Sequence, residues 1–227
     1  MSKPNLIISL GGSLIVPDQI DSVFLKAFRR VILKNQQRYN KIVMVCGGGR
    51  TARQYIAGAV GALPSLSDTE KDWLGIHVGC LNGYLLKLLF KNARKIIVAN
   101  ATLDQDQGLS YCRAVGIGPN HSSDYISVRL AKKYGANEIL NLSNIEYIYD
   151  KNPETHPAAK KLEKVSWREF RQMMGSKWIP SGNFPFDPVA SQLAEKLKMR
   201  VHVMNGRNLK NLDRFLQGQR YKGSVIE

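Results

Sequence analysis

The stretch Asn5-Leu-Ile-Ile-Ser-Leu-Gly-Gly-Ser13 decides the fold of this chain. Its apolar first part predicts a buried strand, and two glycines and a serine end that strand abruptly. Backbone N–H groups approach an anion closely only where no Cβ intervenes, so such a turn is typical of phosphate binding. Gly-Gly-Ser also forms ordinary tight turns, and the rest of the chain has to distinguish the two interpretations.

A second predicted strand, Lys41-Ile-Val-Met-Val-Cys46, also runs into glycines, at Gly47-Gly-Gly49. A helix is expected to begin at Arg50. A strand, glycines and a helix place unpaired N–H groups and the positive end of a helix dipole at one point. A third glycine-bearing loop, from Gly116 to Ser123, precedes another expected helix. This recurrence favours a phosphate site over unrelated turns.

The remaining sequence alternates short apolar runs with stretches of helical periodicity. A polar stretch at 101–109 is interpreted as the seam between two halves. Alternating strands and helices indicate a mostly parallel sheet that is covered by helices on both faces. Strands are expected at 96–99, 111–116, 138–142, 145–149, 200–204 and 223–226. Helices are expected near 22–32, 69–90, 124–134 and 209–216, and after the caps Ser166 and Asp187.

The composition is that of an ordinary globular protein with an unusual charge. The chain has 227 residues, which fits one large α/β domain, and a net charge of +15. The charge could reflect an anionic partner, but the Lys and Arg residues are spread along the sequence without interleaved aromatic residues, which favours a Lys-rich solvated surface. The charge is compatible with small phosphates and gives no indication of nucleic-acid binding. Three scattered cysteines predict no disulfide framework, and a reducing, cytoplasmic location is expected. No apolar run approaches the roughly 20 residues that a membrane helix needs.

Six motifs, taken in order, resemble the amino acid kinase superfamily and, within it, the archaeal-type uridylate (UMP) kinases. The motifs are Leu10-Gly-Gly-Ser13, Gly47-Gly-Gly-Arg-Thr-Ala-Arg53, Asp72-Trp-Leu-Gly-Ile76 with Leu81-Asn82, Ser122-Ser-Asp124, Ser143-Asn144 with Tyr149 and Pro153, and Asp187-Pro188. The resemblance implies a three-layer α/β/α sandwich with a mostly parallel central sheet. It implies a single domain, 1–227, with an acceptor-binding half (1–110) and an ATP-binding half (111–227).

The activity that the resemblance implies is transfer of the γ-phosphoryl group of ATP to UMP, giving UDP. The implied partners are small-molecule nucleotides and further copies of the chain, since the family forms homo-oligomers and its uridylate kinases form hexamers. Mg²⁺ is the implied cofactor, held mainly by the phosphates of ATP. No metal ligands are predicted in the protein itself, because its four histidines lack metal-ligand spacing.

The resemblance also assigns roles to single residues. Asp124 is implied to organise the basic groups of the catalytic site, Arg53 to stabilise the transferring charge, and Ser9 to stand where many members of the superfamily carry Lys. The implied ATP-binding residues are Gly12, Ser13, Gly49, Arg53, Ser143, Asn144, Tyr149 and Asn152. The implied acceptor-binding residues are Gly48, Asp72, Ile117, Gly118, Asn120, His121, Ser122 and Ser123.

Several of these residues have a plainer interpretation as well. Asp124 could cap the helix that begins beside Ser123, and Asp72 could be an exposed acidic residue in the first turn of its helix. Tyr149 could equally pack in the core or contact adenine. Asp187 is expected to be a helix cap rather than a site residue.

Departures from the family pattern keep two alternative functions open. Ser9 replaces the frequent Lys, Cys80 replaces a common Arg, and Asn152 replaces an Asp. The alternatives are another small-molecule kinase of the same superfamily, and a non-catalytic protein that binds nucleotides or oxyanions. Isopentenyl phosphate kinases are disfavoured, because their glycine-rich loop ends in a histidine and residues 47–53 contain none.

Overall fold

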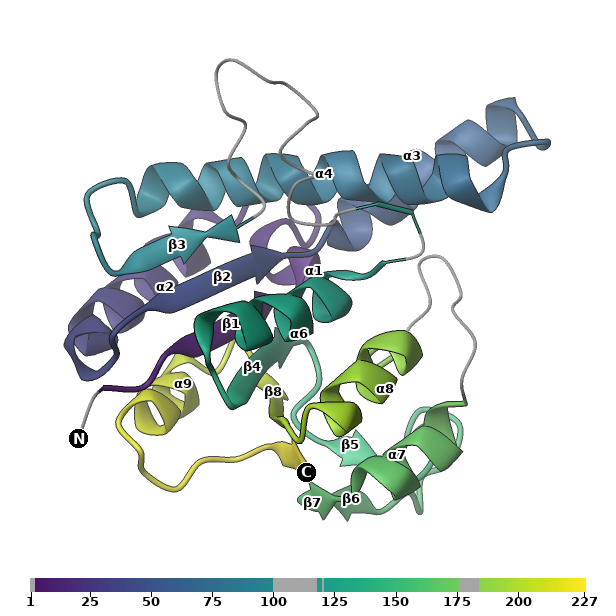
Figure 1. Ribbon diagram of the computed structural model, residues 1–227. Coiled ribbons are helices and arrows are strands. Elements are labelled where there is room, and N and C mark those ends of the chain that lie inside the picture. The colour runs from purple at the N-terminus through teal and green to yellow at the C-terminus, as the bar shows by residue number, and fades with distance from the viewer. Residues whose placement is uncertain (1–2, 100–117, 120, 176–183) are drawn as a thin grey trace.

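A seven-stranded sheet in the order β3-β2-β1-β4-β8-β9-β7 forms the centre of the molecule (Figure 1). The computed structural model describes residues 3–99, 118–119, 121–175 and 184–227. The strands from β3 to β8 are parallel, β9 is antiparallel to β8, and β7 is parallel to β9. The strands are β1 (Leu6–Leu10), β2 (Ile42–Cys46), β3 (Ile96–Val98), β4 (Glu138–Ser143), β7 (Lys164–Val165), β8 (Arg200–Asn205) and β9 (Ser224–Ile226).

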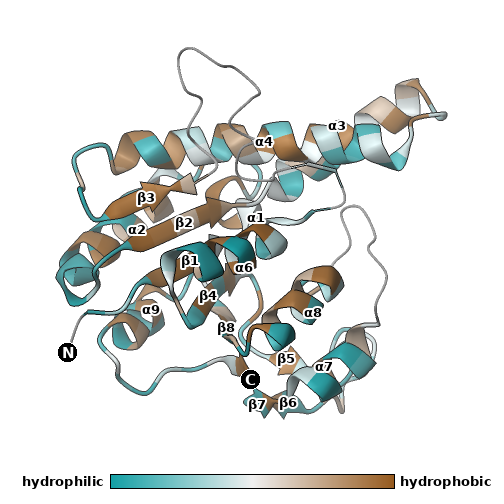
Figure 2. Cartoon of the chain, in the orientation of Figure 1, coloured by the Kyte–Doolittle hydropathy of each residue, from teal (hydrophilic) through white to brown (hydrophobic). Residues whose placement is uncertain are grey.

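The register of the central strands brings their carboxyl ends to one level. Leu10, the last residue of β1, lies opposite Cys46 of β2 and Leu142 of β4. All five residues of β1 and of β2 are buried, as expected of strands that are covered on both faces. Figure 2 shows β2 as apolar along its length. The glycine turns that follow β1 and β2 therefore lie next to each other.

Helices cover both faces of this sheet and enclose two hydrophobic cores. On one face, Phe28 of α2 (Ser22–Asn35) and Leu212 of α9 (Leu209–Leu216) pack with Ile8 and Met44. On the other face, α6 (Ser123–Tyr134), α7 (Trp167–Met174) and α8 (Pro188–Lys196) pack against the alternate residues of the same strands. The predicted three-layer α/β/α sandwich with a mostly parallel sheet is confirmed.

Two helices follow the second glycine turn and lie along each other at one edge of the sheet (Figure 1). They are α3 (Gly49–Ala62) and α4 (Asp68–Leu89). Helix α4 begins with a capping box, in which Ser67 accepts from the Glu70 N–H and Glu70 accepts from the Ser67 N–H. The predicted caps Ser166 and Asp187 are confirmed by hydrogen bonds to the first turns of α7 and α8, and Asp21 caps α2 in the same way.

Two local predictions are wrong, and one short element was not predicted at all. The turn expected after β1 is a short helix, α1 (Gly12–Ile15). The unpredicted element is a 3-10 helix, η1 (Gln36–Arg38), which follows α2. The strand expected at 145–149 shrinks to β5 (Ile148–Tyr149), which pairs with β6 (Lys161–Leu162) in a separate two-stranded sheet. Strand β4 already pairs with β1 and β8, so the central sheet has no position beside β4 for residues 145–149.

Some expectations fall outside the described residues. They include the strand at 111–116 and the seam at 101–109. The division into an acceptor-binding and an ATP-binding half stays a prediction, although strands from both halves share the central sheet. Within the described ranges, no helix has the length and apolar character needed to cross a membrane.

Candidate active site

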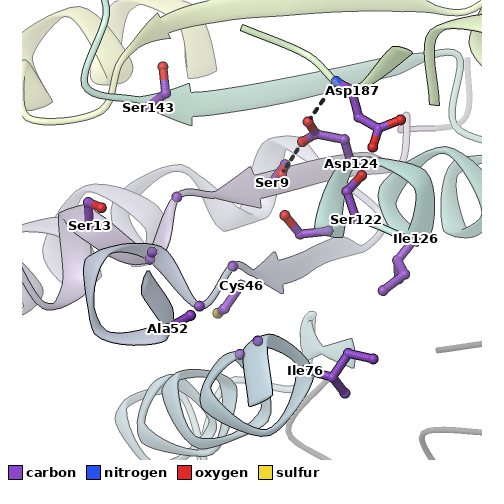
Figure 3. A pocket seen from close by; sticks show the side chains of 18 of the residues that line it. Ser9, Ser13, Cys46, Ala52, Ile76, Ser122, Asp124, Ile126, Ser143 and Asp187 are labelled. Atoms are coloured by element: carbon purple, nitrogen blue, oxygen red, sulfur yellow. Dashed lines mark hydrogen bonds between the residues drawn. The ribbon is translucent and has the colours of Figure 1, made fainter. Parts of the chain in front are cut away.

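A cleft lies at the carboxyl ends of β1, β2 and β4, where ligands bind in open α/β sheets. Gly49, Ser123 and Asp187 line this cleft, and they stand at the starts of α3, α6 and α8. Three helices therefore direct their unpaired N–H groups and positive dipole ends toward one space. This arrangement favours a ligand with several negative charges. Figure 3 shows the cleft from close by.

The two glycine turns contact each other through their backbones. A Cβ at Gly12 would lie 2.3 Å from the Gly47 carbonyl oxygen, and a Cβ at Gly49 would lie 2.3 Å from the Ser13 nitrogen. Gly49 also has a φ of +62°, which side-chain-bearing residues rarely adopt. The Gly47 N–H donates to the Leu10 carbonyl over 3.1 Å. Glycine is needed here so that the two turns can form one continuous cradle of backbone.

The hydroxyl of Ser13 joins the first turn to helix α3. It accepts hydrogen bonds from the Arg50 N–H, over 3.1 Å, and from a terminal nitrogen of Arg53, over 3.3 Å. Arg50 is bound to Asp18 at 2.6 Å, outside the lining of the cleft. Arg53 lines the cleft, so its guanidinium is the group of α3 that can meet a bound phosphate.

Helix α4 supports the backbone cradle of the two glycine turns through the side chain of Asn82. This buried side chain donates to the Gly47 carbonyl over 3.0 Å. A Cβ at Gly48 would lie 2.9 Å from the Gly75 carbonyl oxygen of α4, so this second glycine allows the close approach of the helix. The sequence marks Asn82 only as part of a motif, and its supporting role became visible only in the folded chain.

The carboxylate of Asp124 connects three elements at the floor of the cleft. Its Oδ1 accepts from the Ser9 hydroxyl of β1, and its Oδ2 accepts from the Asp187 N–H at the start of α8, both over 3.1 Å (Figure 3). Ser122, not Asp124, is the cap of α6, because its hydroxyl accepts from the Tyr125 N–H. The alternative of Asp124 as a helix cap is therefore wrong.

The environment of Asp124 disfavours its charge. Burial, and then the negative charge of Asp187, raise the pKa of Asp124 to about 7, against the lowering effect of its two hydrogen bonds. Among the described residues, no Lys or Arg forms an ion pair or hydrogen bond with it. The role of Asp124 in organising basic groups therefore stays a prediction, because its hydrogen bonds go to Ser9 and Asp187 and not to a basic side chain.

Asp187 is both a cap and a part of the cleft, so its interpretation as a cap alone was too narrow. Its Oδ1 accepts from the Ala190 N–H over 2.7 Å, and only 3% of the residue is exposed. Burial raises its pKa. Its Oδ2 is buried and has no hydrogen-bond partner in the described part of the chain. A buried carboxylate oxygen without a partner favours a bound cation or proton beside it.

Most of the predicted acceptor-binding residues line the cleft. Gly48, Asp72, His121, Ser122 and Ser123 all line it. The His121 ring packs on Tyr125 with 4.4 Å between centroids, and its buried Nδ1 has no partner among the described atoms. Asp72 lies in the second turn of α4 and lines the cleft, so it is not simply an exposed first-turn residue.

The predicted ATP-binding residues are only partly brought together. Gly12, Ser13, Gly49, Ser143 and Asn144 line the cleft.

Three further predicted site residues lie away from this lining. Tyr149 pairs with Lys161 in the small sheet, Asn152 accepts from the Glu154 N–H in a turn, and Gly118 is also outside the lining. Ile117 and Asn120 lie outside the described residues. Sequence reasoning missed Lys71 and Asn141, which line the cleft without belonging to any glycine motif.

Comparisons with known proteins agree on one family. The model of the amino acid kinase family matches residues 81–205. The uridylate kinase of Thermoplasma volcanium (strain ATCC 51530 / DSM 4299 / JCM 9571 / NBRC 15438 / GSS1) is 30% identical over 222 residues, which cover 95% of this chain and 94% of that protein. The uridylate kinase of Pyrococcus abyssi (strain GE5 / Orsay) is 27% identical over 226 residues, which cover 98% of this chain and 99% of that protein.

Solved structures share the fold. The uridylate kinase from Archaeoglobus fulgidus matches with a TM-score of 0.73 and 24% identity, over 98% of this chain and 99% of that one. The UMP kinase from Bacillus anthracis matches with a TM-score of 0.74 and 18% identity, over 100% of this chain and 97% of that one. The architecture therefore persists at identities where few individual side chains are shared.

Proposed function

The chain belongs to the amino acid kinase family, and we propose that it is a uridylate kinase, which transfers the γ-phosphoryl group of ATP to UMP and gives UDP and ADP. The observation that carries this proposal is the pair of glycine turns in direct backbone contact, which line one cleft together with Arg53 and Asp124 where three helices begin. Curated relatives along nearly the whole chain are named uridylate kinase.

The cradle holds the phosphates of the two nucleotides next to each other. Gly12, Ser13 and Gly49 bind the phosphates of ATP, and Gly48 with the start of α6 binds the phosphate of UMP. A phosphate oxygen of UMP attacks the γ-phosphorus, the new P–O bond forms, and the bond from the γ-phosphorus to the bridging oxygen breaks. Positioning and charge neutralisation supply most of the catalysis in such reactions. Arg53 neutralises the group in transfer through its planar fork.

Mg²⁺ fits this site on the grounds of charge and of donor chemistry. When bound, it neutralises the phosphates of ATP. Asp124 and the unpartnered Oδ2 of Asp187 are the oxygen donors that a hard cation prefers, and they are not neutralised by Lys or Arg within the described residues. Ser9, where a Lys is frequent, contributes a hydroxyl that holds Asp124.

We also propose that the chain forms a homo-oligomer and acts in the cytoplasm. The outer face of α4 supports the first part, because Leu81, Tyr84 and Leu88 recur at helical spacing and are 67%, 43% and 51% exposed. Apolar side chains gathered on one helix face are typical of a surface that another protein covers.

An acceptor screen with purified protein, ATP and Mg²⁺ tests the proposed activity. ADP release is measured with UMP, CMP and isopentenyl phosphate, and the thermal stability of the same sample is measured with and without ATP. We expect release with UMP well above the other acceptors. ADP release with another acceptor alone would support kinase activity but contradict UMP as the substrate. Stabilisation by ATP without release with any acceptor would favour the non-catalytic alternative.

A further inference from the structure

A second cavity, of about 860 Å³, lies at the opposite end of the sheet from the active-site cleft. Asn5, Glu138 and Arg200 line it at the amino ends of β1, β4 and β8. Tyr39 and Lys95 line it just before β2 and β3 begin. Because these strands are parallel, their amino ends share one edge of the sheet, away from the carboxyl ends that form the cleft. We call this space the basal cavity.

The charge in the basal cavity is positive and only partly compensated. Lys3, Lys95 and Arg200 line it, against a single carboxylate, Glu138. Glu138 is already compensated, since a terminal nitrogen of Arg200 lies 3.1 Å from its Oε1 and the His202 ring lies 3.8 Å from its Oε2. Neither lysine has a carboxylate partner in the described part of the chain. Two cationic side chains are therefore available to a ligand.

The walls of the basal cavity are held by hydrogen bonds. The Asn40 N–H donates to the Pro4 carbonyl over 2.9 Å, and the Asn40 side chain donates to the Asn5 side chain over 3.0 Å. The Lys95 ammonium donates to the Tyr39 carbonyl over 3.0 Å, which fixes it at the wall of the cavity. An ammonium has three N–H donors, so further N–H groups can donate to a ligand. These hydrogen bonds within the protein join the N-terminal segment to the loops before β2 and β3. The cavity is thus formed before any ligand enters.

Concavity distinguishes these cations from the many others on a chain of net charge +15. A lysine on a convex surface is fully hydrated and screened, whereas a hollow lined by charge of one sign concentrates its field on the space inside. The amide side chains of Asn5, Asn40 and Asn137 add neutral donors and acceptors around that space. Its volume falls in the range of small-molecule sites, which is about 300 to 1,000 Å³.

We propose that the basal cavity binds a small anion with several phosphate groups, of the size of a nucleoside polyphosphate. Lys3 and Lys95 meet the phosphate oxygens as point charges, whereas Arg200 is held in ion pairs with Glu138 and Glu227. Half-buried Tyr39 also lines this space, and its hydroxyl donates to the Leu216 carbonyl over 3.2 Å. This site is separate from the proposed active site and does not depend on the proposed reaction.

Calorimetric titration with tripolyphosphate tests the proposal through matched variants. The test variant is Lys3→Gln with Lys95→Gln, and the control is Lys26→Gln with Lys91→Gln, which removes the same charge from exposed positions that line neither cavity. Any binding in the active-site cleft is common to both variants. We expect the basal binding event in wild type and control, and a loss of affinity on the order of tenfold in the test variant.

Two outcomes would overturn this site. Equal titrations for the test variant, the control and the wild type would place all binding elsewhere, and equal binding of sulfate at matched ionic strength would show a response to charge alone. Hydrogen exchange of the wild-type protein keeps the proposal testable if the test variant folds poorly. Tripolyphosphate should then slow exchange at residues 3–6 and 135–138, and unchanged exchange there would contradict the proposal.

Discussion

At the scale of single residues, Asp124 is held in place at a cost to the folded state. Its hydrogen bonds to Ser9 and Asp187 join β1, α6 and α8, but its surroundings raise its pKa from 3.8 to about 7. Between these values the folded chain holds a proton that the unfolded chain has released. The free energy of unfolding therefore falls as pH rises from about 4 to about 7 through this residue. A functional carboxylate that lowers stability is expected at an active site.

Asp124→Asn should raise stability at neutral pH while lowering activity. The neutral amide removes the unfavourable charge, so the free energy of unfolding should rise at pH 7.5 by up to about 4 kcal/mol. Urea denaturation at pH 4.5 and pH 7.5 measures the difference, which should shrink toward the lower pH. Turnover should fall on the order of 100-fold. A stability difference of the same size at both pH values would show that the charge of Asp124 is not its cause.

Ser9→Lys tests whether the site works without the cation that is frequent at this position. Ser9 is 2% exposed and donates to Asp124, so a lysine there would displace that bond and crowd the end of β1. We expect turnover to be unchanged or lower. Ser9→Ala serves as the control, because it removes the hydroxyl without adding charge. Turnover that rises with lysine and falls with alanine would mean that the site lacks a positive charge it needs.

At the scale of the elements, two glycines of one helix have opposite requirements. Gly49 has a positive φ and its Cβ would strike the backbone of Ser13, whereas a Cβ at Gly58 would meet nothing within 4 Å. Both belong to α3. The first is fixed by the contact between the glycine turns, and the second only weakens the helix interior.

Gly49→Ala should therefore destabilise the protein and abolish ATP binding. Gly58→Ala should stabilise it by about 0.5–1 kcal/mol, because alanine is the better helix former. Thermal unfolding with and without ATP measures both effects on each variant. Normal ATP-induced stabilisation of Gly49→Ala would contradict the account of the cradle.

The same elements show which features of the fold and of the site could be predicted from the sequence. Strands β1 and β2 could be predicted because both their faces are apolar, and the caps Ser166 and Asp187 because each precedes a predicted helix. The site residues Gly12, Ser13 and Gly49 followed from the strand endings. The support of Gly47 by Asn82, 35 positions away, has no local signal. The same is true of the bond between Asp187 and Asp124, 63 positions apart.

At the scale of the whole molecule, the sheet separates two regions that both suit anions. The active-site cleft lies at the carboxyl ends of the strands and the basal cavity at their amino ends. Strands β1 and β4 and their neighbouring loops contribute to both. The apolar stripe on α4 lies apart from both regions, since none of its three residues lines either one.

The proposed homo-oligomer should depend on that stripe. Leu81→Glu with Leu88→Glu places charges on the exposed face of α4, so the oligomer should dissociate toward the 25.5 kDa chain. Val23→Glu, on the outer face of α2 and 79% exposed, is the matched control and should leave the mass unchanged. Light scattering after size exclusion measures the mass. An oligomer that withstands both changes in α4 must be held by another surface.

The central claim is the transfer of a phosphoryl group from ATP to UMP, and following the label of [γ-³²P]ATP tests it most directly. Purified protein is incubated with labelled ATP, Mg²⁺ and UMP, and the nucleotides are then separated. The label should appear in UDP only when UMP is present, and its rate of appearance should fall on the order of 100-fold in Asp124→Asn. Folded protein that binds ATP but leaves UDP unlabelled would contradict the claim.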